Sequence, residues 1–445
     1  AIFRKYSVAF LLLIMLSGFL RYEITIHQKE TSVIRALNMH QIIFYVDSVE
    51  RDSFSDKKYS VKIIINNKIN GKALLTRSTA TMKLTPGSFY LLKSIKLRPI
   101  KTGKNADSYQ QYLSRNGYSY IGRISKKTTI IEIPGKNIPF TISMMRKLQQ
   151  FRLELADKNL YKLGIRKGSL INGLLLGLKK EIPLSIVDTF KNMGLSHLLA
   201  VSGLHVGFLI LILYQFVNIL PIHKVFRIIL LIVSIFSYAA LTGFSASVIR
   251  TTLMASMIFF ATIINRNYHS INALSAAALL QLFINPDMIF DVGFQLSFSA
   301  VGGIILFYPI IRSKIPLNLS APLYYSLEVL SVSTAASLAT APITLWYFST
   351  IPAFGLILNI FVIPLTFILV GLGVLISLPF PFPLSLIFTY SCDLMSGLYL
   401  SLLNTINNFD IWILIIPENM PGLKIILFTI LAFFTMAITI YQLKR

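Results

Sequence analysis

Two hydrophobic patterns divide the chain. Between residues 40 and 133, apolar and polar positions alternate in short β-branched segments, whereas long apolar runs recur from residue 204 onward. Alternation with a period of two is typical of half-buried β-strands, and an apolar run of about 20 residues is typical of a helix that spans a bilayer. The pattern predicts a polytopic α-helical membrane protein with an N-terminal all-β domain.

The first part contains six strand-like segments separated by turn residues. The expected strands are 40–50, 58–66, 73–76, 87–97, 118–125 and 128–133. Turn signals such as Asn70-Gly71 and Pro86-Gly87 stand between them. This number of short strands favours a small barrel or sandwich, and we expect a five-stranded OB-like barrel.

The second part contains nine apolar runs of spanning length or close to it. They cover residues 204–221, 225–242, 248–264, 271–285, 293–311, 326–346, 352–378, 384–403 and 423–441. A tenth run, 8–20, follows two basic residues and is expected to be an uncleaved anchor helix, with a signal peptide as the alternative. We expect about ten spans, some of them broken or re-entrant at Pro342, Pro364 and the proline run 379–383.

Composition and charge agree with this division. Hydrophobic residues make up 54% of the chain and charged residues only 13%, against about 25% charged residues in soluble globular proteins. Residues 21–147 hold 23 Lys and Arg but only 8 Asp and Glu. Their net charge of +15 is most of the net charge of +24 of the chain. The single cysteine, Cys392, excludes an intramolecular disulfide and a cysteine metal cluster within this chain.

We therefore expect four regions. They are a transmembrane helix at 1–20, a basic OB-like β-domain at 21–140, an amphipathic helical connector at 141–196 and a transmembrane domain at 197–445. A basic amphipathic connector is typical of a helix that lies along the membrane surface. Lys and Arg favour the cytoplasmic side in short loops, and strict alternation of the spans then places the β-domain on the extracytoplasmic side of the plasma membrane.

Polar residues gather where the spanning pattern begins and continue along it. The expected substrate path consists of His197, Ser202, Gly203, His205, Ser247, Arg250, Asp291, Gln295, Ser297 and Asn359. Polar groups at membrane depth are costly to desolvate, so they usually line water, substrate or another helix. Four of them have a structural alternative: the two imidazoles donate to backbone carbonyls, Arg250 snorkels to the interface, and Asp291 caps its helix. With six histidines in the chain, no metal site is expected.

In the β-domain, tyrosines alternate with basic residues. The expected DNA-binding residues are Tyr109, Tyr112, Arg115, Tyr118, Tyr120 and Arg123. Stacking aromatics beside a basic groove hold single-stranded nucleic acid without reading its sequence. The alternative is that tyrosines at alternate strand positions belong to the core while lysines keep an exposed edge soluble. The positive charge exceeds what solubility needs, which favours DNA contact.

Four segments together resemble the ComEC-type competence proteins, the bacterial inner-membrane channels for DNA uptake. They are ADSYQQYLSRNGYSYIGRI at 106–124, HLLAVSGLHV at 197–206, DVGFQLSFSAVGGI at 291–304 and the apolar segment 337–365, in the order of that family. The family's Pro-Ser-x-x-Arg-Ala reads here Ala246-Ser247-Val248-Ile249-Arg250-Thr251, and its Gly-Asp-Arg reads Gly177-Leu178-Lys179-Lys180. The chain contains no H-x-H-x-D-H motif, so it resembles the short form without the metallo-β-lactamase-like domain.

The resemblance implies a channel that imports single-stranded DNA during natural transformation, without catalysis and without a cofactor. Each phosphate that enters a negative cytoplasm costs about 2.3 kcal/mol per 100 mV, and the chain has no G-x-x-x-x-G-K-[ST] loop to supply that work. The expected partners are single-stranded DNA, membrane lipid, a cytoplasmic ATP-driven motor or helicase, a periplasmic or surface DNA receptor and a separate nuclease. Whether the chain acts alone or as a homo-oligomer is left open.

Two other functions stay open at this point. Ala-Val-Ser-Gly at 200–203 resembles the Gly-x-Ser-Gly of rhomboid-type intramembrane proteases, which would make Ser202 the nucleophile of a serine hydrolase. That reading needs a base within hydrogen-bond reach, and no histidine in a later membrane helix is placed to serve. A small-molecule transporter would explain broken spans, but it would not explain the basic β-domain.

Overall fold

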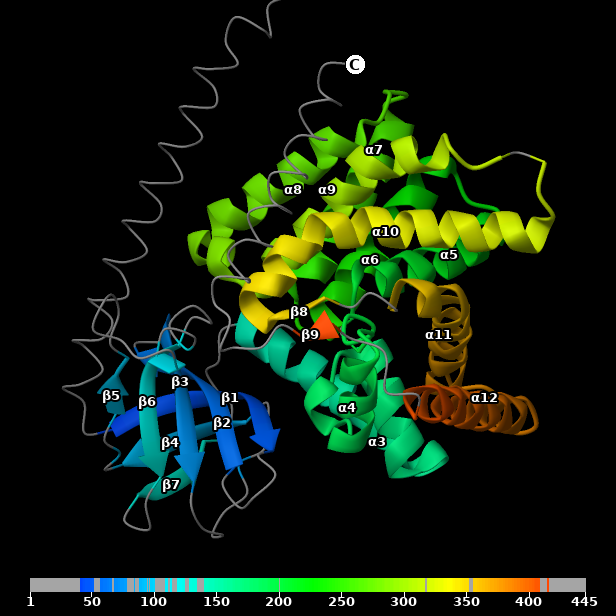
Figure 1. The fold of residues 1–445 in the computed structure, drawn as a ribbon. Helices are drawn as coiled ribbons and strands as arrows, with labels where there is room; N and C mark the ends of the chain where they lie inside the picture. Colours follow the sequence, from blue (N-terminus) through cyan, green and yellow to red (C-terminus); the bar gives the residue numbers. More distant parts are fainter. Residues whose placement is uncertain are drawn as a thin grey trace, which may run out of the picture. The chain divides into compact units, whose positions relative to one another are not determined.

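The structure of the chain is a computed structural model (Figure 1). The described residues are 41–51, 57–65, 68–77, 84, 88–93, 95, 97–100, 109–110, 113, 118–124, 128–133, 140–199, 201–316, 318–351, 355–408 and 414–415. They divide into two compact units, Ala1–Glu154 with Gln281–Asp291, and Leu155–Leu280 with Val292–Arg445. The expected anchor at 1–20 and the last expected span at 423–441 lie outside the described residues.

The first unit contains a curved seven-stranded sheet (Figure 1). Its strands are β1 (Gln41–Arg51), β2 (Lys57–Ile65), β3 (Lys68–Arg77), β4 (Phe89–Lys93), β5 (Leu97–Pro99), β6 (Tyr118–Ile124) and β7 (Thr129–Glu132). The spatial order is β5-β6-β3-β2-β1-β4-β7, and neighbours are antiparallel except β3 and β6, which run parallel. The N-terminal β-domain is confirmed, and the expected strand 87–97 forms two strands, β4 and β5.

Alternation along the strands places one set of side chains in the core of the sheet. The buried residues of this core are Ile42, Phe44, Val46, Tyr59, Val61, Ile63, Ala73, Leu75, Leu84, Tyr90, Leu92, Tyr120 and Ile124. Gly122 on β6 lies where Leu75 and Leu97 approach so closely that an added Cβ would come within 2.8 Å of both side chains. The glycine therefore allows β6 to pack tightly between β3 and β5.

The helical region follows the sheet in the chain. It comprises α3 (Phe140–Leu176), η2 (Lys179–Glu181), α4 (Leu184–Asn192), α5 (Gly203–Ile219), α6 (Lys224–Leu241), α7 (Ala246–Ile263), α8 (Ser270–Ile284), η3 (Pro286–Phe290), α9 (Val292–Arg312), α10 (Ala321–Phe348), α11 (Gly355–Ser377) and α12 (Leu384–Asn407). Two short strands, β8 (Thr350–Ile351) and β9 (Leu414–Ile415), pair with each other. Helix α3 bends at Gly164, whose φ of 74° lies in the region that glycine adopts without strain.

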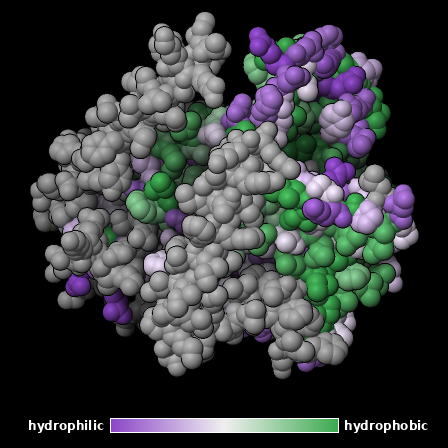
Figure 2. Space-filling model, turned by 45° about the horizontal axis from the view of Figure 1, so that its top comes forward, coloured by the Kyte–Doolittle hydropathy of each residue, from purple (hydrophilic) through white to green (hydrophobic). Residues whose placement is uncertain are grey.

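Six described helices are long and apolar enough to cross a membrane: α6, α7, α9, α10, α11 and α12. Two of the expected spans correspond to the shorter apolar helices α5, of 17 residues, and α8, of 15 residues. Large apolar side chains on the spans, such as Phe226 and Phe236 on α6, are exposed, and Figure 2 shows extensive hydrophobic areas on the face in view. Such a surface is stable against lipid and would be a liability in water. The protein is a membrane protein with at least these six candidate spans.

Proline interrupts these helices less often than expected. Pro342 lies inside α10 and Pro364 inside α11, and both helices continue through the proline. The proline run 379–383 separates α11 from α12 instead of breaking one helix. A proline removes one backbone hydrogen bond, which a long helix packed in a bundle tolerates.

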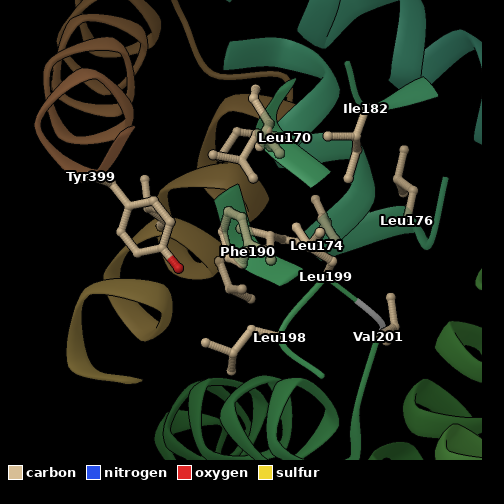
Figure 3. Packing of buried hydrophobic residues seen from close by; sticks show 14 of the residues in the cluster. Leu170, Leu174, Leu176, Ile182, Phe190, Leu198, Leu199, Val201 and Tyr399 are labelled. Carbon is tan, nitrogen blue, oxygen red and sulfur yellow. The ribbon is translucent and has the colours of Figure 1, made fainter. Parts of the chain in front are cut away.

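The core of the second unit lies between α3, α4, α11 and α12 (Figure 3). Leu170 and Leu174 of α3 are fully buried there, and the ring of Phe190 on α4 lies 6.1 Å from that of Tyr399 on α12. The connector expected to lie on the membrane surface therefore contributes its second half to this core. The cause is a run of apolar residues after the bend, which the amphipathic pattern of the first half does not reveal.

Candidate functional site: a buried polar cluster at the start of α5

Ser202 caps the first turn of α5. Its hydroxyl oxygen accepts a hydrogen bond from the Leu204 N–H at 3.2 Å, while the Ser202 N–H donates to Nδ1 of His205 at 3.2 Å. This reciprocal pair is a capping box in which a histidine replaces the usual Glu or Gln. The polar residues at 202–205 thus satisfy backbone groups that the helix itself leaves without partners.

The same contacts fix the protonation of the imidazole. Because Nδ1 of His205 accepts from a backbone N–H, it carries no proton, and the Ser202 hydroxyl at 2.9 Å donates to it as well. The ring proton therefore resides on Nε2, which is fully buried and has no hydrogen-bond partner among the described residues. The expected donation from this histidine to a backbone carbonyl is not found in the described part of the chain.

Helix α7 supplies the next residues of the cluster. The Ser247 hydroxyl accepts a hydrogen bond from the Gly203 N–H at 3.1 Å, and Thr251 donates to the Ser247 carbonyl at 3.1 Å. The helix begins at Ala246, the position that is proline in the resembled motif. Proline is favoured at the first position of a helix, and the helix starts there without it.

Arg250 joins α7 to α9. It is 5% exposed, and its Nη1 donates to the carbonyl oxygen and the hydroxyl of Ser297. Its Nη2 donates to Thr251 Oγ1 at 3.3 Å, and its guanidinium carbon lies 5.8 Å from the centre of the Phe298 ring. Its Nε has no hydrogen-bond partner in the described residues. The arginine is therefore buried in the bundle and does not snorkel.

The guanidinium has no acidic partner in the described part of the chain. Two ion pairs of the helical region, Lys167 with Asp393 and Arg312 with Glu328, do not involve Arg250. A buried cation that is held by neutral dipoles alone retains a strong preference for an anion.

Gly203 provides the space that the guanidinium occupies. A Cβ at this position would lie 2.5 Å from Arg250 Nη2 and 2.5 Å from Thr251 Oγ1. One turn further along α5, a Cβ on Gly207 would meet nothing within 4 Å. The two glycines of this helix therefore differ in role, and only the first borders the cluster.

The other expected path residues lie outside this cluster. His197 is exposed in the turn before α5, and Asn359 on α11 donates to the Ser333 hydroxyl on α10 at 3.1 Å. Gln295 is partly buried on α9, and Asp291 belongs to the other compact unit. The structure thus brings together Ser202, Gly203, His205, Ser247, Arg250 and Ser297 from three helices.

Three residues of these contacts were not anticipated from the sequence. Thr251 and Phe298 contact Arg250, and Ser333 accepts from Asn359. Thr251 carried a signal, since it is a polar residue where the resembled motif has alanine. For Phe298 and Ser333 the sequence gives no comparable signal.

The expected DNA-binding residues of the β-domain divide by burial. Tyr109 and Arg123 are exposed, whereas Tyr120 is fully buried in the sheet core and Tyr118 is 9% exposed. The burial of Tyr118 and Tyr120 corresponds to the core alternative, because a ring without a free face cannot stack on a base. Tyr112 and Arg115 lie outside the described residues.

A pair of lysines lies on the strand positions that alternate with those of the core residues. Lys62 on β2 is directly opposite Lys72 on β3, and each ammonium lies over a tyrosine ring. The distances to the ring centres are 6.0 Å from Lys62 to Tyr45 and 4.4 Å from Lys72 to Tyr118. Neither lysine was singled out from the sequence, because strand register is needed to see that they are neighbours.

The described residues contain no group of three or more His, Cys, Asp or Glu able to hold a metal ion. The helical cluster offers hydroxyls, one neutral imidazole and one guanidinium.

Comparison with known proteins places the chain in a family. Residues 174–442, more than half of the chain, match the family model of the competence protein. ComE operon protein 3 of Bacillus subtilis is 28% identical over 266 residues, which cover 59% of this chain and 33% of that protein. Recombination protein 2 of Haemophilus influenzae is 23% identical over 296 residues, covering 62% and 35% respectively.

A protein from Aquifex aeolicus is 31% identical over 243 residues, covering 54% of this chain and 53% of that protein. The chain thus spans between a third and about half of the length of these relatives, and no solved structure matches it. The matched region includes the whole cluster around Arg250. The chain belongs to the competence protein family, as a membrane protein of the ComEC type.

Proposed function

We propose that the protein is an inner-membrane conduit that imports single-stranded DNA during natural transformation. The observation that carries the proposal is the buried cluster around Arg250, which places a cation without a described acidic partner inside a bundle of apolar helices. Intramembrane charged residues usually mark the path of a substrate, and a guanidinium favours phosphate. Membership of the competence protein family supports a role in DNA uptake.

We infer that the β-domain is an OB-type barrel on the extracytoplasmic side. Strands β1, β2 and β3 form a meander, β3 pairs with β6 in parallel, and the consecutive strands β4 and β5 pair with β1 and β6 respectively. Strands β4 and β5 follow each other in the chain but lie in opposite halves of the sheet, and a sheet with this connection is able to close into a barrel. OB-type barrels bind oligonucleotides on strands two and three and on neighbouring loops.

The lysine pair on β2 and β3 supports capture of DNA by this domain. Lys62 and Lys72 lie directly opposite each other on neighbouring strands, so one phosphate would contact both ammonium groups. The exposed residues Tyr109 and Arg123 are the other proposed contacts. Capture by lysines and arginines releases counterions, so binding should weaken steeply with salt.

Import requires work from other proteins in this proposal. Moving each phosphate toward a negative cytoplasm costs about 2.3 kcal/mol per 100 mV. A cytoplasmic ATP-driven motor or helicase supplies that work, a periplasmic or surface receptor delivers the DNA, and a separate nuclease degrades the other strand.

The proposal is tested by complementing a deletion strain with variants that each lack a single positive charge. Arg250→Gln retains hydrogen-bond donors but removes the charge, and we expect transformation frequency to fall by about tenfold to a hundredfold, the cost of a charge-assisted hydrogen bond. Arg266→Gln, at an exposed position just after α7, is the matched control and should transform like the wild type. Equal transformation by Arg250→Gln and the wild type, at equal protein in the membrane, would refute the conduit.

One observation favours a serine hydrolase as the second candidate. The Ser202 hydroxyl lies 2.9 Å from His205 Nδ1, so a base is within reach of the expected nucleophile after all, within the same helix turn. Ser202→Asn separates the two functions, because asparagine caps a helix as well as serine but cannot act as a nucleophile. A conduit should retain transformation with Ser202→Asn, whereas a hydrolase would lose its activity completely.

A further inference from the structure

The partners of Arg250 suggest that its position changes when substrate is present. In the described residues, the guanidinium donates only to neutral oxygens, those of Ser297 and Thr251. Its Nε is buried and has no hydrogen-bond partner among the residues that the structure describes. A phosphodiester in the place of Ser297 would replace two neutral acceptors, its carbonyl and hydroxyl oxygens, by an anion that accepts two parallel hydrogen bonds, for which the guanidinium geometry is suited.

The contact with Ser297 also connects helices that are far apart in the sequence. Arg250 reaches from α7 to α9, and its Nη2 occupies the space left by the missing side chain of Gly203 at the start of α5. The Gly203 N–H in turn donates to Ser247 on α7. The Arg250 side chain therefore fills the junction of α5, α7 and α9. Its movement away from Ser297 would break the contacts that join these three helices there.

We propose that Arg250 is an exchangeable latch: it closes the junction of α5, α7 and α9 by binding Ser297, and a phosphodiester group of the incoming strand displaces Ser297 and opens the junction. The inference rests on the proposed conduit function and adds to it the ligand of Arg250 and the closed state. The ligand is recognised by charge, because the guanidinium is the charged group of this cluster and a phosphodiester is the anionic group that every nucleotide of the strand carries.

The experiment uses the purified full-length chain in liposomes and measures potassium efflux. A short oligothymidylate with phosphodiester linkages is compared with the same oligomer with uncharged methylphosphonate linkages. Wild-type vesicles should be tight alone and with the uncharged oligomer, and the phosphodiester oligomer should raise efflux by about tenfold, the factor equivalent to one charge-assisted hydrogen bond. A side chain that only stabilised the fold would not distinguish the two oligomers.

Two variants remove the latch by different means. Arg250→Gln should leak without any oligomer and show no further response, while Arg266→Gln should behave like the wild type. If Arg250→Gln does not fold, Gly203→Ala keeps the arginine but places a methyl group where Nη2 lies, and Gly207→Ala is its control on the same helix. Gly203→Ala should leak, and Gly207→Ala should not.

Two results would overturn the latch. One is wild-type efflux that stays unchanged while the same vesicles bind the phosphodiester oligomer, and the other is tight vesicles from both Arg250→Gln and Gly203→Ala. The same variants are also assayed for transformation. If Arg250→Gln still fails to support transformation, either result overturns the latch but leaves the conduit standing. Normal transformation by that variant would instead remove the function on which the latch depends.

Discussion

At the scale of single residues, Gly203 determines where the Arg250 guanidinium lies. Gly203→Ala places a Cβ 2.5 Å from Arg250 Nη2 and 2.5 Å from Thr251 Oγ1, so both the guanidinium and the threonine hydroxyl have to move. We expect transformation to fall by about tenfold, equivalent to about 1.4 kcal/mol, with at most a modest fall in the melting temperature in detergent. Gly207→Ala should transform normally and gain up to about 1 kcal/mol of stability, because alanine is the better helix former.

The opposite pattern would contradict this role of Gly203. Loss of stability with normal transformation would show that Gly203 serves packing alone, and an equal effect of the two alanines would show that neither glycine is special. The two readouts, melting temperature and transformation, are measured on the same set of variants.

At the scale of elements, α9 and α10 pack against each other at Gly303, where a larger side chain does not fit. A Cβ on Gly303 would lie 2.5 Å from the Ala335 carbonyl oxygen and 2.5 Å from the Ala339 Cβ, both of which are fixed to the α10 backbone. Gly303→Ala should therefore separate the helices and lower the free energy of unfolding by about 1–3 kcal/mol. Gly302→Ala is the neighbouring control, since its nearest contact would be at 3.9 Å.

Thermal unfolding of both variants in detergent, followed by circular dichroism, checks this prediction. Gly303→Ala should melt below the wild type and Gly302→Ala at or above it. Equal melting temperatures for the two variants would mean that α9 and α10 do not pack as described.

The sequence predicted the type of most elements and the order in which they occur. Alternation located the strands, and apolar runs located the helices, because both signals are periodic and local. It did not predict which face of β6 is buried, so the buried Tyr120 was expected to bind DNA. The contacts of Arg250 with Ser297, 47 residues away, depend on tertiary packing, and a periodic pattern contains no information on them.

At the scale of the whole molecule, a net charge of +24 predicts salt-dependent DNA binding. The logarithm of the binding constant should fall linearly with the logarithm of the salt concentration. Each lost phosphate contact to single-stranded DNA reduces that slope by about 0.7, so Lys62→Gln combined with Lys72→Gln should reduce it by about 1.4. Fluorescence anisotropy on the full-length protein in detergent measures both slopes.

A charge-matched control separates local contact from total charge. Lys147→Gln combined with Lys191→Gln removes the same charge at exposed positions on α3 and α4. This pair should leave the slope nearly unchanged. Equal reductions by the two double variants would show that the lysine pair of the sheet is no special contact.

A strand that passes beside Arg250 should form a photo-crosslink to a neighbouring residue during uptake. A photoreactive amino acid is placed at Phe298, next to the guanidinium, or at Phe236, on the exposed apolar surface of α6. Cells that are taking up labelled DNA should yield a crosslinked strand from position 298 and none from position 236. Continued uptake without a crosslink at 298, or equal crosslinking at both positions, would contradict a path through this junction.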